Sequence, residues 1–198
     1  MKANRVRIIG GAWRSRYINF PDGRDLRPTP DRVRETLFNW LGQDLSGLRC
    51  LDLYAGSGAL GFEAASRGAA RVVLVERERT VCAALTLSRA ALNAQQVEVV
   101  RADALEFLRT DHGVYDVVFL DPPFADDRWA VLLQEIIPRL APEAWVYREH
   151  GQSRDQQALP DGWDVHRHGR AGQVHYELLK LGLKRKLHDD QSGIPGYV

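Results

Sequence analysis

The chain has 198 residues, of which 44% are hydrophobic and 27% charged, values that argue against a disordered, collagen-like or disulfide-rich protein. Its two cysteines, Cys50 and Cys82, lie in apolar stretches and are too few for a zinc cluster, so we expect reduced core residues of a cytoplasmic protein. No apolar run approaches the roughly 20 residues of a membrane span, and we expect neither secretion nor a membrane partner.

The net charge of +1 hides an uneven distribution. Residues 1–34 hold nine basic and three acidic side chains, whereas residues 35–160 hold twelve basic and eighteen acidic ones. A basic arm on an acidic body predicts contact with a polyanion through the arm, because only the arm can release counterions from phosphates. A solvated basic surface is the alternative that charge bias alone leaves open.

The first elements belong to this arm. Alternation over residues 16–20 predicts a short strand or hairpin. A helix is expected next, with Thr29 as its cap and Pro30 in its first position. Its apolar positions fall at helical spacing, and Gly42 or Gly47 is expected to end it.

From residue 49 onward, short apolar runs alternate with helical patterns. Strands are expected at residues 50–53, 72–75, 97–100, 117–120 and 144–147. Helices are expected at residues 58–67, 79–94, 103–109 and 127–140. This alternation predicts an α/β fold with a mostly parallel sheet that is covered on both faces.

The last part of the chain breaks the alternation. Residues 163–168 and 174–181, separated by a Gly-containing turn, predict an antiparallel hairpin at the sheet edge. We therefore divide the chain into a basic N-terminal extension (1–41), a catalytic domain (42–183) and a disordered tail (184–198).

The first expected strand runs into a glycine-rich loop. Gly56, Gly58 and Gly61 form G-x-G-x-x-G between a strand and a helix, and Glu76 ends the next strand. This pattern is typical of sites where ribose hydroxyls bind the carboxylate and a ligand approaches the loop backbone. It does not by itself choose between NAD and another adenosine cofactor.

Asp52 favours S-adenosylmethionine. It precedes the first glycine by four residues, where a pyrophosphate would meet like charge but an ammonium and a sulfonium would be stabilised. Asp103 follows the third strand, either as an acceptor for the adenine amino group or as a plain helix cap. The full set of expected cofactor-binding residues is Asp52, Tyr54, Ala55, Gly56, Ser57, Gly58, Glu76, Arg77, Asp103 and Ala104.

Asp121, Pro122, Pro123 and Phe124 end the fourth strand in a rigid turn. The Asp121 carboxylate and the Pro122 carbonyl offer acceptors for the two N–H groups of a nucleobase amine, and Phe124 offers a stacking face. Acceptors on both hydrogens free the nitrogen lone pair for attack on a sulfonium methyl. We expect these four residues to form the catalytic turn.

The chain resembles a known family. Residues 8–16, residues 26–41, the glycine loop and the Asp-Pro-Pro-Phe turn closely resemble RsmD-type bacterial 16S rRNA guanine-N2 methyltransferases. The likeness covers about residues 5–181, and Ser15 replaces a glycine that is common in the family. Acidic Asp126 and Asp127 are a second departure, after the catalytic turn.

The resemblance implies a Rossmann-like class I methyltransferase fold with S-adenosylmethionine as methyl donor. It also implies a guanine of 16S rRNA, within the assembled small ribosomal subunit, as acceptor. Together with the charge pattern, it suggests the RNA-binding residues Arg7, Trp13, Arg14, Arg16, Arg24, Arg27, Arg32 and Arg34. For Arg32 and Arg34 there are two alternatives: they position the cofactor side of the pocket, or they form ion pairs with Asp31 or Glu35.

Other functions stay open at this point. The same turn serves adenine-N6 and cytosine-N4 methyltransferases, so guanine N2 rests on the resemblance. An NAD-dependent oxidoreductase would use the glycine loop but not the Asp-Pro-Pro-Phe turn, and a noncatalytic rRNA-binding module would use only the arm. Nothing in the composition indicates an oligomer, and we expect a monomer.

Overall fold

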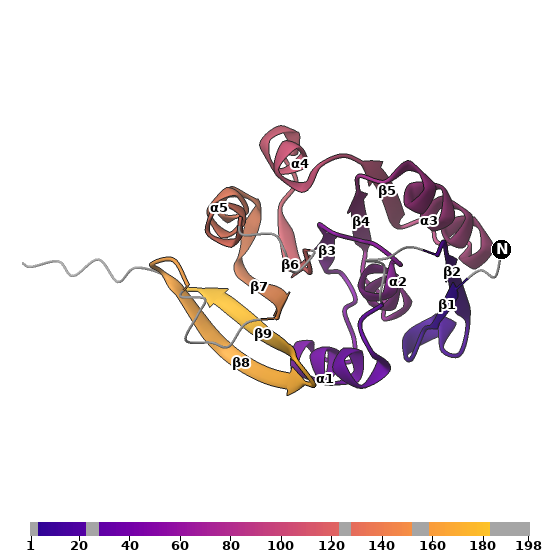
Figure 1. Ribbon diagram of the computed structural model, residues 1–198, viewed down its shortest axis with the longest axis horizontal. Helices are drawn as coiled ribbons and strands as arrows, with labels where there is room; N and C mark the ends of the chain where they lie inside the picture. Colours follow the sequence, from indigo (N-terminus) through magenta and orange to yellow (C-terminus); the bar gives the residue numbers. More distant parts are fainter. Residues whose placement is uncertain (1–3, 23–27, 123–127, 152–158, 183–198) are drawn as a thin grey trace, which may run out of the picture.

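The computed structural model describes residues 4–22, 28–122, 128–151 and 159–182. Its centre is a seven-stranded sheet in the order β5-β4-β3-β6-β7-β9-β8 (Figure 1). The strands are β3 (Arg49–Asp52), β4 (Arg71–Glu76), β5 (Val97–Arg101), β6 (Tyr115–Leu120), β7 (Leu140–His150), β8 (Trp163–Ala171) and β9 (Val174–Leu181). The neighbouring strands β5, β4, β3, β6 and β7 pair in parallel, and β9 is antiparallel to both β7 and β8. The α/β fold and its antiparallel edge are confirmed.

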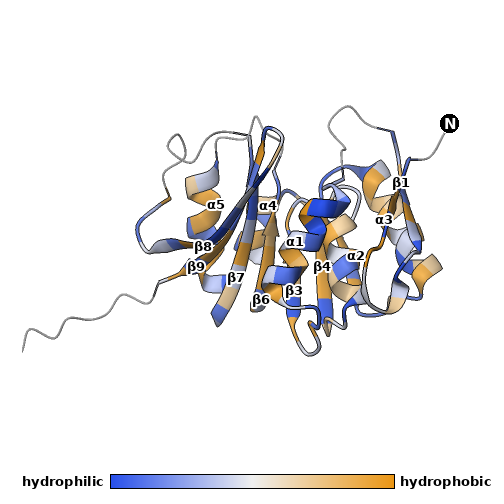
Figure 2. Ribbon diagram, turned by 90° about the horizontal axis from the view of Figure 1, so that it is seen from below, coloured by the Kyte–Doolittle hydropathy of each residue, from blue (hydrophilic) through white to orange (hydrophobic). Residues whose placement is uncertain are grey.

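Helices cover both faces of the sheet. The helices are α1 (Asp31–Leu41), α2 (Ala59–Ser66), α3 (Arg79–Leu92), α4 (Ala104–Thr110), α5 (Trp129–Glu135) and the 3-10 helix η2 (Ile137–Arg139). Apolar residues of α1, α2 and α3 form one core, and those of α4 and α5 form a second core on the other face. Figure 1 shows the sheet between these two helix layers, and Figure 2 shows that central strands such as β4 and β6 are largely hydrophobic. Because β5, β4, β3, β6 and β7 are parallel, their carboxyl ends lie at one shared edge of the sheet.

The basic arm is a separate hairpin that packs on the first core. It consists of β1 (Asn4–Arg7), the 3-10 helix η1 (Gly11–Trp13) and β2 (Tyr17–Phe20). Figure 1 places it beside α2 and α3, at the opposite end of the molecule from β8 and β9. Ile18 and Phe20 are buried in the same core as the helices, so the arm is fixed to the body by hydrophobic packing.

Several expected boundaries differ in the structure. Helix α1 begins at Asp31 with Pro30 as its cap residue, so the prediction that Thr29 caps it is wrong. The expected helix at 127–140 is shorter, because α5 ends at Glu135 and Pro138 lies in the 3-10 turn that follows. Strand β8 continues to Ala171, so the turn of the final hairpin is shorter than expected and consists of Gly172 and Gln173.

Gly42 ends α1 as expected, with a φ of 98°. The tail at 184–198 lies outside the described residues, and the proposed division at residue 41 stays a prediction. None of the helices in the described part of the chain has the length and apolarity to cross a bilayer.

Candidate active site

The glycine loop joins β3 to α2 as the sequence predicts. The Ala55 N–H donates to the Val75 carbonyl (3.0 Å), and the Gly58 N–H donates to the Ala55 carbonyl (2.6 Å). Gly58 has a φ of 79°, and a Cβ there would lie 2.7 Å from side-chain atoms of Leu85 and Phe62. The tight turn therefore requires glycine at this position.

Glu76 holds the loop from the neighbouring strand. Its carboxylate accepts hydrogen bonds from the Gly56 N–H (3.1 Å) and from the Glu78 N–H (2.9 Å). The side chain is half-buried, and Arg77 beside it is exposed. Glu76 thus lies at the loop, where the fingerprint predicts a ribose-binding carboxylate.

Asp52 is a buried carboxylate with one oxygen unused. Oδ2 accepts from the Gly61 N–H (3.1 Å), while Oδ1 is buried and has no hydrogen-bond partner among the described residues. Burial raises the pKa of Asp52 to about 7, although the nearby backbone N–H groups of Gly61 and Tyr54 oppose the shift. A buried acceptor without a partner is costly, so this site suits a ligand with positive charge or N–H donors.

The strand register places the acidic residues on one face of the sheet. Leu74 of β4 is opposite Asp52, and Asp52 is opposite Phe119 of β6. Because side chains alternate along a strand, Glu76 and Asp121, each two residues further on, point to the same face as Asp52. The charge of Asp52 contributes to the raised pKa of Asp121, as expected for neighbours.

Asp121 and Pro122 follow directly after β6, at the edge of the sheet where parallel strands end. Asp121 is half-buried and Pro122 is buried. Burial, followed by the charges of Glu149 and Asp52, raises the pKa of Asp121 well above its usual value. Pro123, Phe124 and the acidic pair Asp126 and Asp127 lie outside the described residues.

Asp103 occupies the cap of α4. Its Oδ1 accepts from the N–H groups of Leu105 (2.9 Å) and Glu106 (3.4 Å), so the capping interpretation is confirmed. Oδ2 lies 3.7 Å from Nη1 of Arg128, which precedes α5. Ala104 is buried in the first turn of this helix, and a contact of Asp103 with adenine stays a prediction.

Sequence reasoning missed Glu149, which adds a further carboxylate to this face. Register pairs Phe119 with Tyr147, so Glu149, two residues further on, points to the same face as Asp121. Its Oε1 accepts from Tyr147 Oη (2.7 Å) and from Thr29 Oγ1 (2.9 Å). Thr29 therefore binds a residue of β7 instead of capping α1. The only sequence signal was an acidic residue near the end of an apolar strand.

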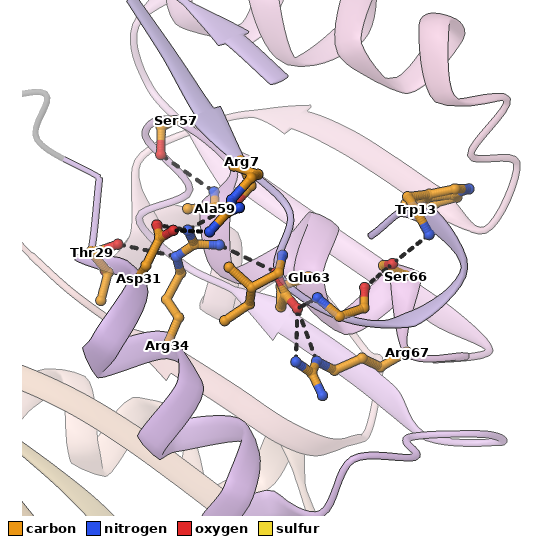
Figure 3. Close-up of polar contacts among 12 residues, drawn as sticks. Arg7, Trp13, Thr29, Asp31, Arg34, Ser57, Ala59, Glu63, Ser66 and Arg67 are labelled. Atoms are coloured by element: carbon orange, nitrogen blue, oxygen red, sulfur yellow. Dashed lines mark hydrogen bonds and ion pairs between the residues drawn. The ribbon is translucent and has the colours of Figure 1, made fainter. Parts of the chain in front are cut away.

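The arm is joined to α2, the helix after the glycine loop, by a second carboxylate that the sequence did not reveal. Glu63 of α2 is fully buried and accepts from the backbone N–H groups of Ile9 (2.9 Å) and Gly10 (2.7 Å) (Figure 3). It also forms ion pairs with Arg34 (3.2 Å) and Arg67 (2.9 Å). Four groups thus converge on one carboxylate beneath the hairpin.

The structure corrects the expected role of Arg34. Its side chain is 0% exposed and donates to the carbonyls of Thr29 (3.1 Å) and Arg7 (2.8 Å), besides pairing with Asp31 (2.5 Å) and Glu63. A fully buried guanidinium that makes four hydrogen bonds within the protein is not available to a phosphate. Arg34 is therefore a structural residue, and the ion-pair alternative is the one the structure bears out.

The remaining arm residues are placed at the surface. Arg7, Arg14, Arg16 and Arg32 are exposed, and Trp13 is half-buried. Arg7 pairs with Asp31 (3.2 Å), and Arg16 donates to the Ala91 carbonyl (2.6 Å). Arg14 borders a groove of about 520 Å³ between the arm and α1. Arg24 and Arg27 lie outside the described residues.

Ser15 in the arm turn has a φ of 69°, in the left-handed region where glycine is favoured. This conformation agrees with the expectation, drawn from the resemblance, that glycine fits this position.

Comparisons with known proteins agree with this geometry. Ribosomal RNA small subunit methyltransferase D of Escherichia coli K12 is 44% identical over 184 residues, covering 90% of this chain and 91% of that protein. The protein of the same name from Haemophilus influenzae is 40% identical and covers 88% of this chain and 93% of its own length.

Solved structures show the same fold. A putative methyltransferase of Escherichia coli matches with a TM-score of 0.82 at 43% identity, over 90% of this chain and 99% of that chain. Another putative methyltransferase, solved with SAH, matches with a TM-score of 0.63 over 82% of this chain and 53% of that chain, but at 16% identity it supports the fold alone. The architecture is the Rossmann-like α/β fold of class I methyltransferases.

The family model described as Conserved hypothetical protein 95 matches residues 6–180. With that match and the identities above, the chain belongs to this family, the RsmD-type methyltransferases.

Proposed function

We propose that this chain transfers a methyl group from S-adenosylmethionine to the exocyclic N2 amine of a guanine in 16S rRNA. The observation that carries the proposal is that Asp52 and Asp121 lie on the same face of the sheet, on the neighbouring strands β3 and β6, where the glycine loop follows β3. The relatives named ribosomal RNA small subunit methyltransferase D support the RNA class. The guanine N2 atom follows from the resemblance to the RsmD-type enzymes.

The described residues fit the cofactor. S-adenosylmethionine supplies an electrophilic methyl group on a positively charged sulfur when it is bound. Glu76 is placed to accept from ribose hydroxyls, and the unused Oδ1 of Asp52 favours the ammonium or sulfonium end. The Gly56 N–H of the glycine loop donates to Glu76, which joins the loop backbone to this carboxylate. Arg77, Asp103 and Ala104 extend the site toward the adenine.

The catalytic turn, residues 121–124, makes the target amine a better nucleophile. Asp121 and the Pro122 carbonyl accept its two N–H groups, which draws the nitrogen lone pair out of the ring system. The nitrogen forms the new bond to carbon, the carbon–sulfur bond breaks with its electron pair on sulfur, and one N–H proton is released toward Asp121. The raised pKa of Asp121 suits a group that takes up this proton. Phe124 is assigned to stacking on the base.

The arm is assigned to RNA phosphates. Arg7, Arg14, Arg16 and Arg32 are exposed, and Trp13 lies among them with its backbone N–H bonded to Ser66 (2.9 Å). Arg24 and Arg27 complete the proposed set by charge alone. We assign the assembled small ribosomal subunit as substrate, and a monomer as the working form in the cytoplasm.

A transfer assay tests the proposal. The protein is incubated with labelled S-adenosylmethionine and with small ribosomal subunits that lack the modification, with free 16S rRNA in parallel, and the labelled nucleotide is mapped by mass spectrometry. We expect one guanine methylated at N2, with faster transfer to the particle. Label on adenine N6 or cytosine N4 would contradict the base assignment. Binding of NADH in place of S-adenosylmethionine would contradict the reaction.

A further inference from the structure

Glu149 lies beside the catalytic turn without a part in the chemistry described above. Leu120 of β6 is paired with Arg148 of β7, so one step further along both strands brings Asp121 level with Glu149. Neighbouring strands are about 4.8 Å apart, and both side chains point to the α1 face of the sheet. After burial, the charge of Glu149 is the largest contribution to the raised pKa of Asp121.

The carboxylate of Glu149 is held in one orientation. It is 4% exposed, and the hydroxyls of Tyr147 and Thr29 both donate to Oε1. Within the described residues, no hydrogen bond reaches Oε2, and no lysine or arginine forms an ion pair with this carboxylate. The two donors lower the pKa of Glu149 against the larger opposing effect of burial. Such an arrangement leaves Oε2 for a donor that arrives from outside the chain.

Asp52, Asp121 and Glu149 form a carboxylate row on one face of the sheet. This carboxylate row gives a second, independent sign of a ligand. Asp52, on the adjacent strand β3 and 1% exposed, has its buried Oδ1 without a partner among the described residues. Two carboxylates on the same face, on strands either side of β6, thus each have an oxygen that no described group satisfies. Asp121 lies between them.

Nucleobases differ in what they present next to the reactive amine. On the Watson–Crick edge of guanine, the N1–H donor is adjacent to the N2 amine. In adenine and cytosine, the ring nitrogen adjacent to the amine is an acceptor. A carboxylate next to the amine-binding turn therefore forms a hydrogen bond with guanine and faces a repulsive lone pair with either of the other bases.

We propose that Glu149, fixed by Tyr147 and Thr29, accepts the N1–H of the target base and is the residue that restricts this site to guanine. The inference rests on the proposed methyl transfer and adds to it the residue that determines the base. Thr29 precedes α1, and Arg34 donates both to the Thr29 carbonyl and to the Arg7 carbonyl of the arm, so this contact also links recognition of the base to the arm.

The test uses RNA in which 2-aminopurine replaces the target guanine. This base keeps the N2 amine, but its N1 is an acceptor. We expect the wild type to show kcat/KM for 2-aminopurine at least about 100-fold below that for guanine, because a site built around a donor rejects an analogue without it. In Glu149→Gln the amide can donate to N1, so the preference for guanine should shrink at least tenfold or reverse. The matched control is Glu143→Gln on the same strand, whose carboxylate is 78% exposed.

Tyr147→Phe provides a second variant that removes one hydrogen bond from Oε1 and keeps the charge. We expect it to reduce the preference for guanine severalfold. The proposal is overturned if Glu149→Gln, or Tyr147→Phe in case the first variant does not fold, keeps the wild-type preference while still methylating guanine N2. Methylation by the wild type at a different atom would instead overturn the proposed function itself.

Discussion

Two buried carboxylates, one before and one after the glycine loop, have opposite surroundings. Glu63 accepts two backbone N–H groups and pairs with two arginines, so its charge is compensated within the protein. Asp52 accepts from the Gly61 N–H but has a buried oxygen without a partner among the described residues, and burial raises its pKa to about 7. The contrast separates a carboxylate that holds the fold together from one that is prepared for a ligand.

The same contrast extends to the strands on either side. Asp121 and Glu149 are on the Asp52 face, and burial raises the pKa of each. On the other face of the sheet, Glu177 pairs with Arg148 (2.7 Å). Burial acts to raise the pKa of Glu177, but the hydrogen bond from His150 and the charge of Arg148 lower it to about 2. Asp52, Asp121 and Glu149 thus lack the paired cations that compensate Glu63 and Glu177 among the described residues.

The largest expected effect is on the catalytic turn. Replacing Asp121 with Asn removes the proton acceptor and should lower kcat by about 10²–10⁴-fold. Cofactor affinity, measured by calorimetry, should stay within a few-fold of wild type. An equally severe loss of cofactor binding would contradict the role given to Asp121.

Breaking the Glu63 cluster tests the structural half of the comparison. Glu63→Ala leaves two buried guanidinium groups and two N–H groups without their acceptor, so we expect a loss of about 3–5 kcal/mol in the free energy of unfolding. Urea denaturation measures this loss. The control is Glu98→Ala, which removes the exposed pair with Arg71 and should cost less than about 1 kcal/mol. Equal losses in the two variants would show that the cluster contributes no more than a surface pair.

Asp52 gives cofactor binding a predictable pH dependence. A cation beside the carboxylate favours its ionised form, so binding lowers the pKa from about 7 and releases a proton. Affinity should therefore fall about tenfold as the pH drops from 8 to 6, measured by calorimetry in buffers of different ionisation enthalpy. In Asp52→Asn this pH dependence should flatten.

The stability of the folded protein without cofactor should change with pH in the opposite direction to cofactor affinity. Because the pKa of Asp52 is raised in the folded state, its contribution to stability is fully present below pH 4 and is lost as the pH rises through about 7. Asp52→Asn should accordingly be more stable than wild type at pH 8 without cofactor. A destabilised Asn variant at that pH would contradict the view that the carboxylate lacks compensation.

The arm arginines should determine part of the dependence of RNA affinity on salt concentration. Replacing Arg14 and Arg16 with Gln should weaken binding and reduce the slope of log affinity against log salt by about one per lost phosphate contact. Arg167 on β8 is exposed at the other end of the sheet and serves as the control. An unchanged slope in the double variant would remove the arm from the interface.

The smallest effect concerns Ser15. With its φ of 69°, replacement by Gly relieves backbone strain and should raise the free energy of unfolding by about 0.5–1 kcal/mol. Transfer activity should be unchanged, because the substitution removes strain without touching the carboxylate row.

Local patterns predicted most of the fold. The strands, the glycine loop and the final hairpin depend on neighbours within a few residues, so periodicity and turn chemistry were sufficient. Thr29 was assigned wrongly, and the contact of Arg34 with Glu63 was missed, because these partners are distant in the chain: Thr29 binds Glu149, 120 residues away, and Glu63 lies 29 residues after Arg34. Long-range pairing of this kind leaves no periodic signal.

The site was predicted in part. Asp52, Glu76 and Asp121 each follow a recognisable motif, and the structure places them on one face of the sheet. Glu149 has no motif and depends on the register of β7 against β6, which the sequence does not show. A lone Glu63 within the apolar helix Ala-Leu-Gly-Phe-Glu-Ala-Ala-Ser was the one available hint of the buried cluster.

A crystal structure of the protein with a bound S-adenosylmethionine analogue tests the central claim most directly. We predict ribose hydroxyls on Glu76, the positively charged end of the ligand at the Asp52 carboxylate, and a Glu63 cluster unchanged from the one described. A ligand bound away from Asp52, or Asp52 turned toward a protein cation in the bound state, would contradict the account.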